Sequence, residues 1–333
     1  MPTPRNKDWF AYKTSEQAPR EFLARSLAAE LGLDFEPDDI AMTAGAFGAI
    51  ALAIRLVLSP GDECVIPVPG WFCYEATLLM ADAKAVRARL DPTRFDLDLD
   101  AIDAAIGPRT GMVIVNSPHN PTGRVYSRSE LEALADLLER ASARIGRRIF
   151  LLSDEPYRRI RFDGIGFTSP AAVYPWTLID YSYGKVLLAP GQRLGYLAVS
   201  PLMPEPERAA LRGAMFSTQM ALGWTFPNAV MQYAVPDLEH LSIDMSALTR
   251  RRDRVLSELE PLGYEFAPPE GTFYLFGKAP GDDDTAFFNA PADRDVFVMP
   301  GAILDTPGHF RMCLTANDEM IERALPAFRA LAR

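Results

Sequence analysis

The chain has 333 residues, of which 48% are hydrophobic and 23% are charged, and its formal net charge is -10. This length exceeds the usual size of one hydrophobic core, so we expect two domains, and the composition is ordinary for a globular protein. The negative charge argues against a surface that binds nucleic acid or an anionic membrane, although a few local arginines suffice to hold a small anionic ligand.

The cysteines, histidines and apolar stretches exclude further classes. Cys64, Cys73 and Cys313 are odd in number and form no CxxC pair, so we expect no disulfide framework and a reducing compartment. The three histidines lack the spacing of metal ligands, so we expect no metal site. The N-terminus has no apolar signal region, and the longest apolar stretch, 46–58, is too short to span a bilayer. A cytoplasmic protein is therefore expected.

Helices and strands alternate in the first part of the chain. Leucines and alanines at helical spacing predict helices, and short apolar runs predict buried strands. The predicted helices are 15–32, 46–58, 72–82 and 127–145, and the predicted strands are 63–68, 85–88, 111–115, 148–152, 177–181 and 194–199. This alternation indicates an α/β domain whose largely parallel sheet is covered by helices on both faces.

A proline-rich break at 201–206 precedes a second part with a different order of elements. Its predicted elements are helical segments within 207–258, strands at 271–276, 296–299 and 310–314, and a last helix at 317–332. This order is typical of an α+β unit with its own core. We therefore predict a large α/β domain over 14–205, and a smaller unit formed by 206–333 together with the N-terminal arm 1–13.

One lysine has an unusual setting. Lys185 is one of five lysines, and it alone follows an apolar run, 177–181, that is typical of a buried strand. Arg193 lies eight positions later. A lysine amine forms a Schiff base with an aldehyde, and an arginine grips a phosphate with two hydrogen bonds. Pyridoxal 5'-phosphate (PLP) needs both groups. A lone lysine is more often a surface residue, so the interpretation depends on the rest of the chain.

Further polar and aromatic residues follow the predicted strands, where open α/β sheets bind ligands. A buried carboxylate at Asp154 would keep a pyridine nitrogen protonated. Asn120 and Tyr157 suit a ring hydroxyl, and Trp71 suits stacking on the ring. Each has a plainer reading: Asp154 as a turn cap, 120–123 as an ordinary turn, and Trp71 as a core residue. Their order along the chain favours the shared site.

The start of the second predicted helix is a candidate phosphate site. Gly45, Ala46 and Phe47 open this helix, and the backbone amides and dipole of a helix N-terminus favour an anion. Ser182 and Arg193 would complete the phosphate site. Helices commonly start near glycine, so Gly45 alone is a weak signal.

These motifs resemble those of a known family. The runs 116–123 and 153–157, and Ser182 with Lys185 through Arg193 to 196, are similar to the class I/II aminotransferases of PLP fold type I, such as aspartate aminotransferase. The resemblance extends from about residue 20 to the C-terminus. It implies a large α/β domain with a mainly parallel seven-stranded sheet flanked by helices, a smaller C-terminal α+β domain, and a homodimer with shared active sites.

The resemblance also implies roles for individual residues. Lys185 would be the catalytic lysine that binds PLP, Asp154 would pair with the pyridine nitrogen, and Asn120 and Tyr157 would contact the ring oxygen. Arg311, in the predicted strand 310–314, would clamp the substrate α-carboxylate, and Asn120 and Trp71 would line the same pocket. The residues implied to hold the phosphate are Gly45, Ala46, Phe47, Ser182, Arg193 and, across the dimer, Tyr12.

The implied reaction is transamination between an L-amino acid and a 2-oxo acid, in which Lys185 also moves the α-proton. Two alternatives stay open: a PLP-dependent C–S lyase on the same fold, and a non-catalytic PLP-binding protein. The expected aromatic pocket favours neutral or aromatic donors, while three arginines leave an acidic side chain open. The pocket residues are Phe10, Tyr12, Phe47 and Trp71, and the arginines are Arg124, Arg158 and Arg159.

Overall fold

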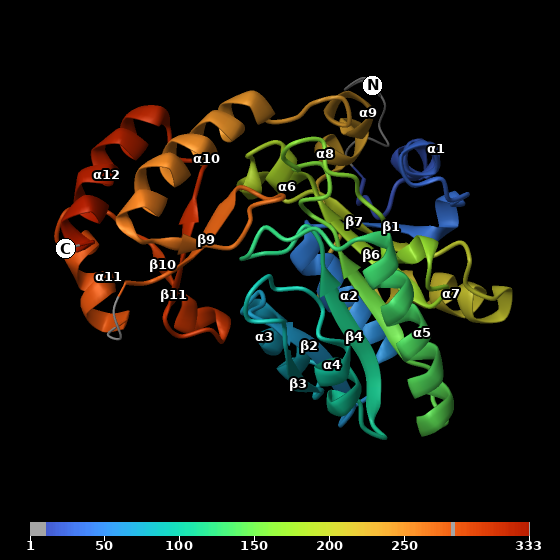
Figure 1. Cartoon of the computed structure of the whole chain (residues 1–333). Helices are drawn as coiled ribbons and strands as arrows, with labels where there is room; N and C mark the ends of the chain where they lie inside the picture. The colour runs from blue at the N-terminus through green and yellow to red at the C-terminus, as the bar shows by residue number, and fades with distance from the viewer. Residues whose placement is uncertain (1–10, 281–283, 333) are drawn as a thin grey trace.

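The computed structural model describes residues 11–280 and 284–332. Its larger part contains a seven-stranded sheet with the order β1-β7-β6-β5-β4-β2-β3 (Figure 1). The pairs among β2 to β6 are parallel, whereas β7 runs antiparallel to both β1 and β6. The predicted mainly parallel seven-stranded sheet is therefore confirmed. The strands are β1 Ile40–Thr43, β2 Glu63–Val68, β3 Lys84–Arg89, β4 Thr110–Asn116, β5 Phe150–Asp154, β6 Thr177–Ser182 and β7 Gly195–Val199.

Helices cover this sheet, and their ends carry the expected signals. Helix α5 begins after Ser127, whose side chain forms a capping box with Glu130, and it ends at Gly146 in the left-handed conformation. Helix α2 packs against β5, β6 and β7. The helices up to the end of the large sheet are α1 Gln17–Leu31, α2 Ala46–Val57, α3 Cys73–Leu79, α4 Leu99–Ala105, α5 Arg128–Ile145 and α6 Tyr183–Val186.

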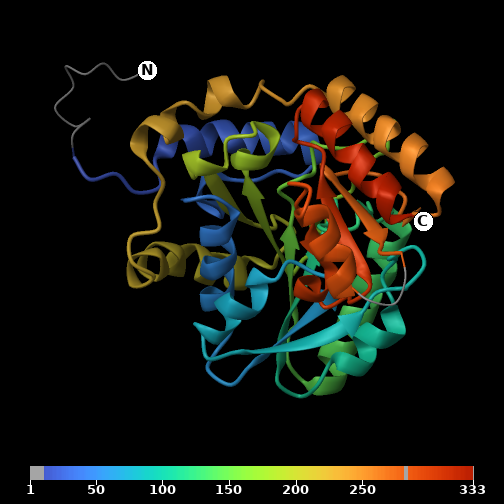
Figure 2. The same cartoon turned by 90° about the vertical axis from the view of Figure 1, so that its left-hand side faces the viewer.

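The C-terminal part is built around a four-stranded antiparallel sheet with the order β10-β11-β9-β8. Figures 1 and 2 show α10, α11 and α12 gathered around this smaller sheet. Its buried apolar cluster includes Val255, Phe310 and Phe328, so this part has its own core. The elements are α7 Glu205–Ala221, α8 Ala229–Tyr233, α9 Val235–Leu238, α10 Met245–Leu259, β8 Glu265–Phe266, β9 Tyr274–Lys278, α11 Asp284–Ala292, β10 Met299–Pro300, β11 His309–Cys313 and α12 Asp318–Leu331.

Most predicted elements match the structure, and the exceptions are short. Strands β1 and β8 and helices α4, α6 and α11 were not predicted. Strand β1 has four residues, and α4 begins within an Asp-rich passage where Asp98 caps it. The strand expected at 296–299 is reduced to β10, which pairs with β11 through two residues. The predicted domain boundary falls at the start of α7 and stays a prediction. Within the described part of the chain, no helix is long and apolar enough to cross a membrane.

Candidate active site

The carboxyl ends of β4, β5 and β6 meet at one edge of the large sheet. Asn116 of β4 lies opposite Asp154 of β5, and Asp154 lies opposite Asp180 of β6. The Asn116 Nδ2 donates to the Asp154 carbonyl at 2.8 Å, and its Oδ1 accepts from the backbone N–H of Asn120 at 2.6 Å. These bonds fix the loop that carries Asn120 beside the end of β5.

The Asp154 carboxylate is buried and only partly paired. Its Oδ2 accepts a short hydrogen bond from the Tyr74 hydroxyl, while its Oδ1 has no hydrogen-bond partner among residues 11–280 and 284–332. Burial raises the pKa of Asp154, and the hydrogen bond from Tyr74 and the charge of Lys185 oppose that rise. A buried carboxylate oxygen without a partner fits the protonated pyridine nitrogen of PLP.

Lys185 follows the end of β6 in the short helix α6. The Ser182 Oγ caps this helix by accepting from the backbone N–H of Gly184 at 3.3 Å. The Lys185 amine lies 5.5 Å from the centre of the Tyr157 ring. Burial lowers the pKa of Lys185, and the charges of Arg311 and Arg193 lower it further, against the charge of Asp154. A lowered pKa increases the fraction of neutral amine, the form that acts as a nucleophile or base.

Arg193 lies against the start of α2, where the sequence predicts a phosphate site. Its Nη2 donates to the Ala44 carbonyl at 2.9 Å and its Nη1 to the Pro190 carbonyl at 2.8 Å. Gly45 caps α2 with φ of 80°, and a Cβ there would lie 2.5 Å from the Arg193 Nη2. The backbone conformation therefore favours glycine at this position, and a side chain there would also displace the Arg193 guanidinium. The structure brings Gly45, Ala46 and Phe47 together with Arg193.

An aromatic cluster adjoins Asp154. The rings of Phe47 and Tyr74 each contact Trp71 edge to face, with centroids 5.3 Å apart in both pairs. Phe47 is 43% exposed. Trp71 therefore contacts the tyrosine that donates to the buried Asp154 carboxylate. Its stacking on the cofactor ring stays a prediction.

Arg311 reaches the large sheet from the small one. From β11, its Nη1 donates to the Asn120 Oδ1 at 2.7 Å, and its guanidinium lies 4.0 Å from the centre of the Tyr274 ring. The Tyr157 hydroxyl in turn donates to the Tyr274 hydroxyl at 3.3 Å. Arg311, Asn120 and Tyr157, which were predicted from separate stretches of sequence, therefore meet in one place.

Tyr12 is exposed at the surface. Its side chain is 91% exposed, and its ring contacts Trp224 with centroids 5.4 Å apart. The expected role of Tyr12 concerns a partner subunit and stays a prediction. Phe10 lies outside the described residues.

Three site residues were missed at the level of sequence. Tyr74 lies in the predicted helix 72–82, three positions after the candidate Trp71, and this nearness in sequence was the one available signal. Asp180 is the one acidic residue in the apolar run 177–181. Tyr274 lies in a predicted strand, and nothing local distinguishes it from a core residue.

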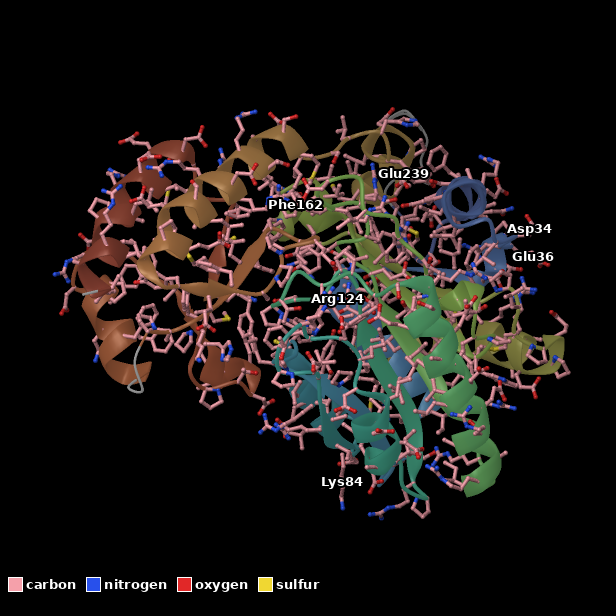
Figure 3. The ribbon with its side chains drawn as sticks, in the orientation of Figure 1. Asp34, Glu36, Lys84, Arg124, Phe162 and Glu239 are labelled. Atoms are coloured by element: carbon pink, nitrogen blue, oxygen red, sulfur yellow. The ribbon has the colours of Figure 1, made fainter. Side chains whose placement is uncertain are left out.

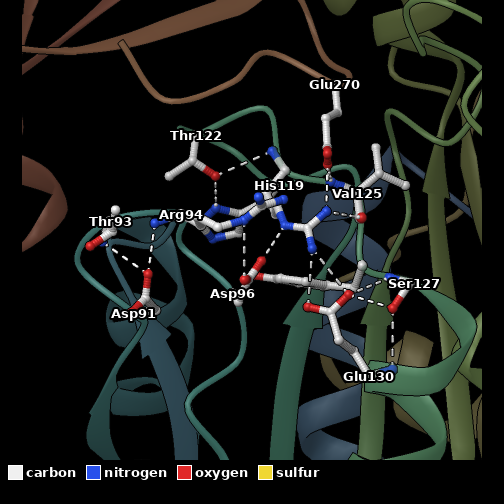
Figure 4. A network of polar contacts seen from close by, with 12 residues as sticks. Asp91, Thr93, Arg94, Asp96, His119, Thr122, Val125, Ser127, Glu130 and Glu270 are labelled. Atoms are coloured by element: carbon white, nitrogen blue, oxygen red, sulfur yellow. Dashed lines mark hydrogen bonds and ion pairs between the residues drawn. The ribbon is translucent and has the colours of Figure 1, made fainter. Parts of the chain in front are cut away.

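The arginines considered for an acidic substrate are engaged elsewhere. Arg124, which is labelled in Figure 3, donates to the carboxylates of Asp96, Glu130 and Glu270, the last at 2.6 Å. Figure 4 shows these three acidic residues from close by. Arg158 donates to Glu30 at 2.8 Å, and Arg159 donates to two backbone carbonyls. Each guanidinium thus serves the structure.

Comparisons with known proteins show the family of this chain. The family model described as aminotransferase class I and II matches residues 6–328. The chain belongs to this family. It is 32% identical over 325 residues to an aspartate/prephenate aminotransferase of Cereibacter sphaeroides, covering 90% of this chain and 78% of that protein. It is also 32% identical over 329 residues to an aspartate/prephenate aminotransferase of Thermus thermophilus, covering 94% and 81%.

Solved structures give the same result. The structure of an amino transferase from Eubacterium rectale superimposes with a TM-score of 0.93 at 33% identity, covering 99% of this chain and 83% of that one. The chain is therefore a PLP-dependent aminotransferase with the fold of aspartate aminotransferase. The expected family, activity and cofactor are confirmed, and the lyase and the non-catalytic alternatives are not favoured.

Proposed function

We propose that this aminotransferase moves the amino group of a neutral or aromatic L-amino acid to a 2-oxo acid at the site around Lys185. The partnerless oxygen of Asp154, buried beside Lys185, carries this assignment of the site, because it provides the negative charge that the pyridine nitrogen needs. Bound PLP supplies an aldehyde that takes up the amino group and a ring that stabilises the electron pair left at the substrate Cα.

Each candidate residue has a proposed task. Lys185 holds the cofactor and, once freed, removes the proton from the substrate Cα and delivers it on the same face. Arg311 binds the α-carboxylate and Trp71 stacks on the ring. Asn120 and Tyr157 contact the ring oxygen. The residues proposed to hold the phosphate are Gly45, Ala46, Phe47, Ser182 and Arg193, with Tyr12 of a second subunit.

The lean toward neutral or aromatic donors rests on the surroundings of Trp71. Phe47 and Tyr74 flank that ring, and Tyr274 lies under Arg311. The Arg124 guanidinium already forms ion pairs with three carboxylates, so it does not serve as a counter-ion for an acidic substrate. An apolar wall favours an apolar side chain, because a buried charge without a counter-ion is costly. The names of the relatives favour a second candidate donor, aspartate.

A single-turnover panel tests the function and separates the two candidates. Holoenzyme is mixed with one amino acid and no 2-oxo acid, and the absorbance of the bound cofactor is followed. Conversion from the aldehyde to the amine form by phenylalanine or leucine faster than by aspartate supports the neutral or aromatic lean. Faster conversion by aspartate favours the second candidate. Absence of conversion with every amino acid contradicts the proposed site.

We also propose a homodimer that shares its active sites. An exposed apolar face supports it: Phe216 is 55% exposed, Met220 42% and Trp224 40%, and Trp224 contacts Tyr12 and Phe226. Such a face is typical of a protein interface. Sedimentation equilibrium should give twice the chain mass for the wild type and a lower mass for the F216S/W224S variant. A monomeric wild type at micromolar concentration would contradict the dimer.

A cytoplasmic location belongs to the same proposal. Cys64, Cys73 and Cys313 are all free thiols, which suits a reducing compartment. Fractionation of the producing cells, followed by immunodetection of the chain, tests it.

A further inference from the structure

Two carboxyl groups lie side by side beneath the proposed pyridine site. Asp154 of β5 and Asp180 of β6 are directly opposite each other in a parallel pair, so their side chains point to the same face. Asp154 is 4% exposed and Asp180 is fully buried. Neither oxygen of Asp180 has a hydrogen-bond donor among the described residues. Two ionised carboxylates on directly opposite residues of neighbouring strands, both buried, would repel each other strongly, so one of them must keep a proton.

The surroundings decide which carboxyl keeps the proton. Burial raises the pKa of Asp154, but the hydrogen bond from the Tyr74 hydroxyl and the charge of Lys185 oppose that rise and favour its ionised form over that of Asp180. Asp180 has neither. Burial and the charges of Asp154 and Glu155 raise its pKa well above the ordinary value. Helix α2, which packs on β6, carries a single ionisable residue, Arg55, and that residue is exposed.

We propose that Asp180 is a positioning residue: a neutral carboxylic acid that donates its proton in a hydrogen bond to the Asp154 carboxylate. The pair then carries one negative charge, which matches the single positive charge of a protonated pyridine nitrogen. Tyr74 from α3 and Asp180 from β6 both donate to the Asp154 carboxylate and reduce its basicity. The proton between Asp154 and the pyridine nitrogen then stays on the nitrogen. This inference rests on the proposed role of Asp154.

The proton on Asp180 is measured first in the cofactor-free enzyme by infrared spectroscopy. Burial raises the pKa of Glu155 to about 7, so spectra are taken at about pH 9, where Glu155 is ionised. Wild type should show the carbonyl band of a protonated carboxylic acid. D180N should lose the band, and E155Q should retain it. The absence of a band in wild type, or a band that persists in D180N and disappears in D154N, would overturn the proposal.

The effect on the cofactor is measured with three chains: wild type, D180N and D180L. The amide of D180N still donates a hydrogen bond, whereas D180L does not. We expect the Kd for PLP to rise about ten-fold or more in D180L and about three-fold or less in D180N. With ¹⁵N-labelled PLP, the nitrogen resonance should shift toward that of unprotonated pyridine in D180L alone.

The outcomes separate this inference from the proposed function. If wild type binds no PLP, the proposed site itself fails. If wild type binds PLP and D180L matches it, or if D180N and D180L lose affinity equally, the donor role of Asp180 is wrong. Circular dichroism and thermal melting of each cofactor-free variant check the fold. Should D180L not fold, the infrared comparison of wild type with D180N decides the question.

Discussion

Tyr74 donates its phenolic hydrogen to Oδ2 of Asp154 and thereby joins helix α3 to the end of β5. Burial and the adjacent Asp154 raise the pKa of Tyr74 well above its ordinary value, so the hydroxyl keeps its proton. The same ring contacts Trp71. Tyr74 thus serves both the carboxylate and the aromatic wall.

The hydroxyl of Tyr74 is therefore expected to matter for the cofactor. Y74F keeps the ring contact with Trp71 and removes the hydrogen bond to a charged group, so the Kd for PLP should rise about ten-fold. Fluorescence titration of the cofactor-free enzyme measures it. The matched control is Y126F, because the Tyr126 hydroxyl is buried without a hydrogen-bond partner in the described part of the chain. Equal affinities in Y74F and wild type would contradict the prediction.

Arg311 is expected to act on every substrate alike. All amino acids share the α-carboxylate, so R311Q should raise KM for each donor by about a hundred-fold, the size expected when one partner of a charge-assisted hydrogen bond is removed. PLP affinity should not change. Steady-state kinetics with two donors measure it, and R323Q, at an exposed ion pair with Glu319, is the control. An increase in KM for one donor alone would show that Arg311 binds the side chain of that donor and not the shared α-carboxylate.

Glu155 should make stability fall as pH rises. Burial raises its pKa from 4.5 to about 7, against the charge of Arg158 and hydrogen bonds from Ser169 and Ser153. A raised folded-state pKa stabilises the folded form fully below pH 4.5, and this contribution is lost as pH rises through about 7.

The variant E155Q is neutral at every pH and lacks this dependence. Relative to wild type, its free energy of unfolding should therefore increase by roughly 3 kcal/mol between about pH 5 and about pH 8. Urea unfolding of the cofactor-free enzymes at the two pH values measures the difference. Parallel pH profiles for the two proteins would rule this out.

Arg124 is expected to stabilise the fold rather than to bind substrate. Its side chain is 12% exposed and pairs with Asp96, Glu130 and Glu270. R124M leaves three carboxylates without their cation, and should lower the free energy of unfolding by about 2–3 kcal/mol. The control is R128A, because Arg128 and Glu132 form an exposed pair whose loss should change stability by less than about 0.5 kcal/mol. A preference for neutral over acidic donors that changes in R124M would contradict the assignment.

The sequence was sufficient to predict the large sheet and the strand ends that carry the site. Lys185, Asp154 and Asn120 each follow a short apolar run, and parallel strands place such ends at one edge. Arg311 depended on family resemblance, because its contact with Asn120 spans most of the chain and no local pattern encodes it. That contact exists because β11 belongs to a second sheet that packs toward the first.

The residues missed were those whose role depends on a partner from another element. Asp180 is a single acid in an apolar strand, and its meaning appears only when the register places it opposite Asp154. Tyr74 lies in a predicted helix, and its hydroxyl meets the Asp154 carboxylate only because α3 lies beside β5 in the fold. Strand β1 was too short for its periodicity to be distinguished from a loop.

The bond between Arg311 and Asn120 has a consequence for how amino acids enter. Before an amino acid binds, the Arg311 guanidinium already donates to the Asn120 amide oxygen. The substrate carboxylate must therefore displace this oxygen. A measured affinity for an amino acid then reports how much better its carboxylate accepts from Arg311 than the Asn120 oxygen does. Replacing Asn120 by a residue without an acceptor would remove this competition. It would also remove the hydrogen bond that orients the Arg311 side chain.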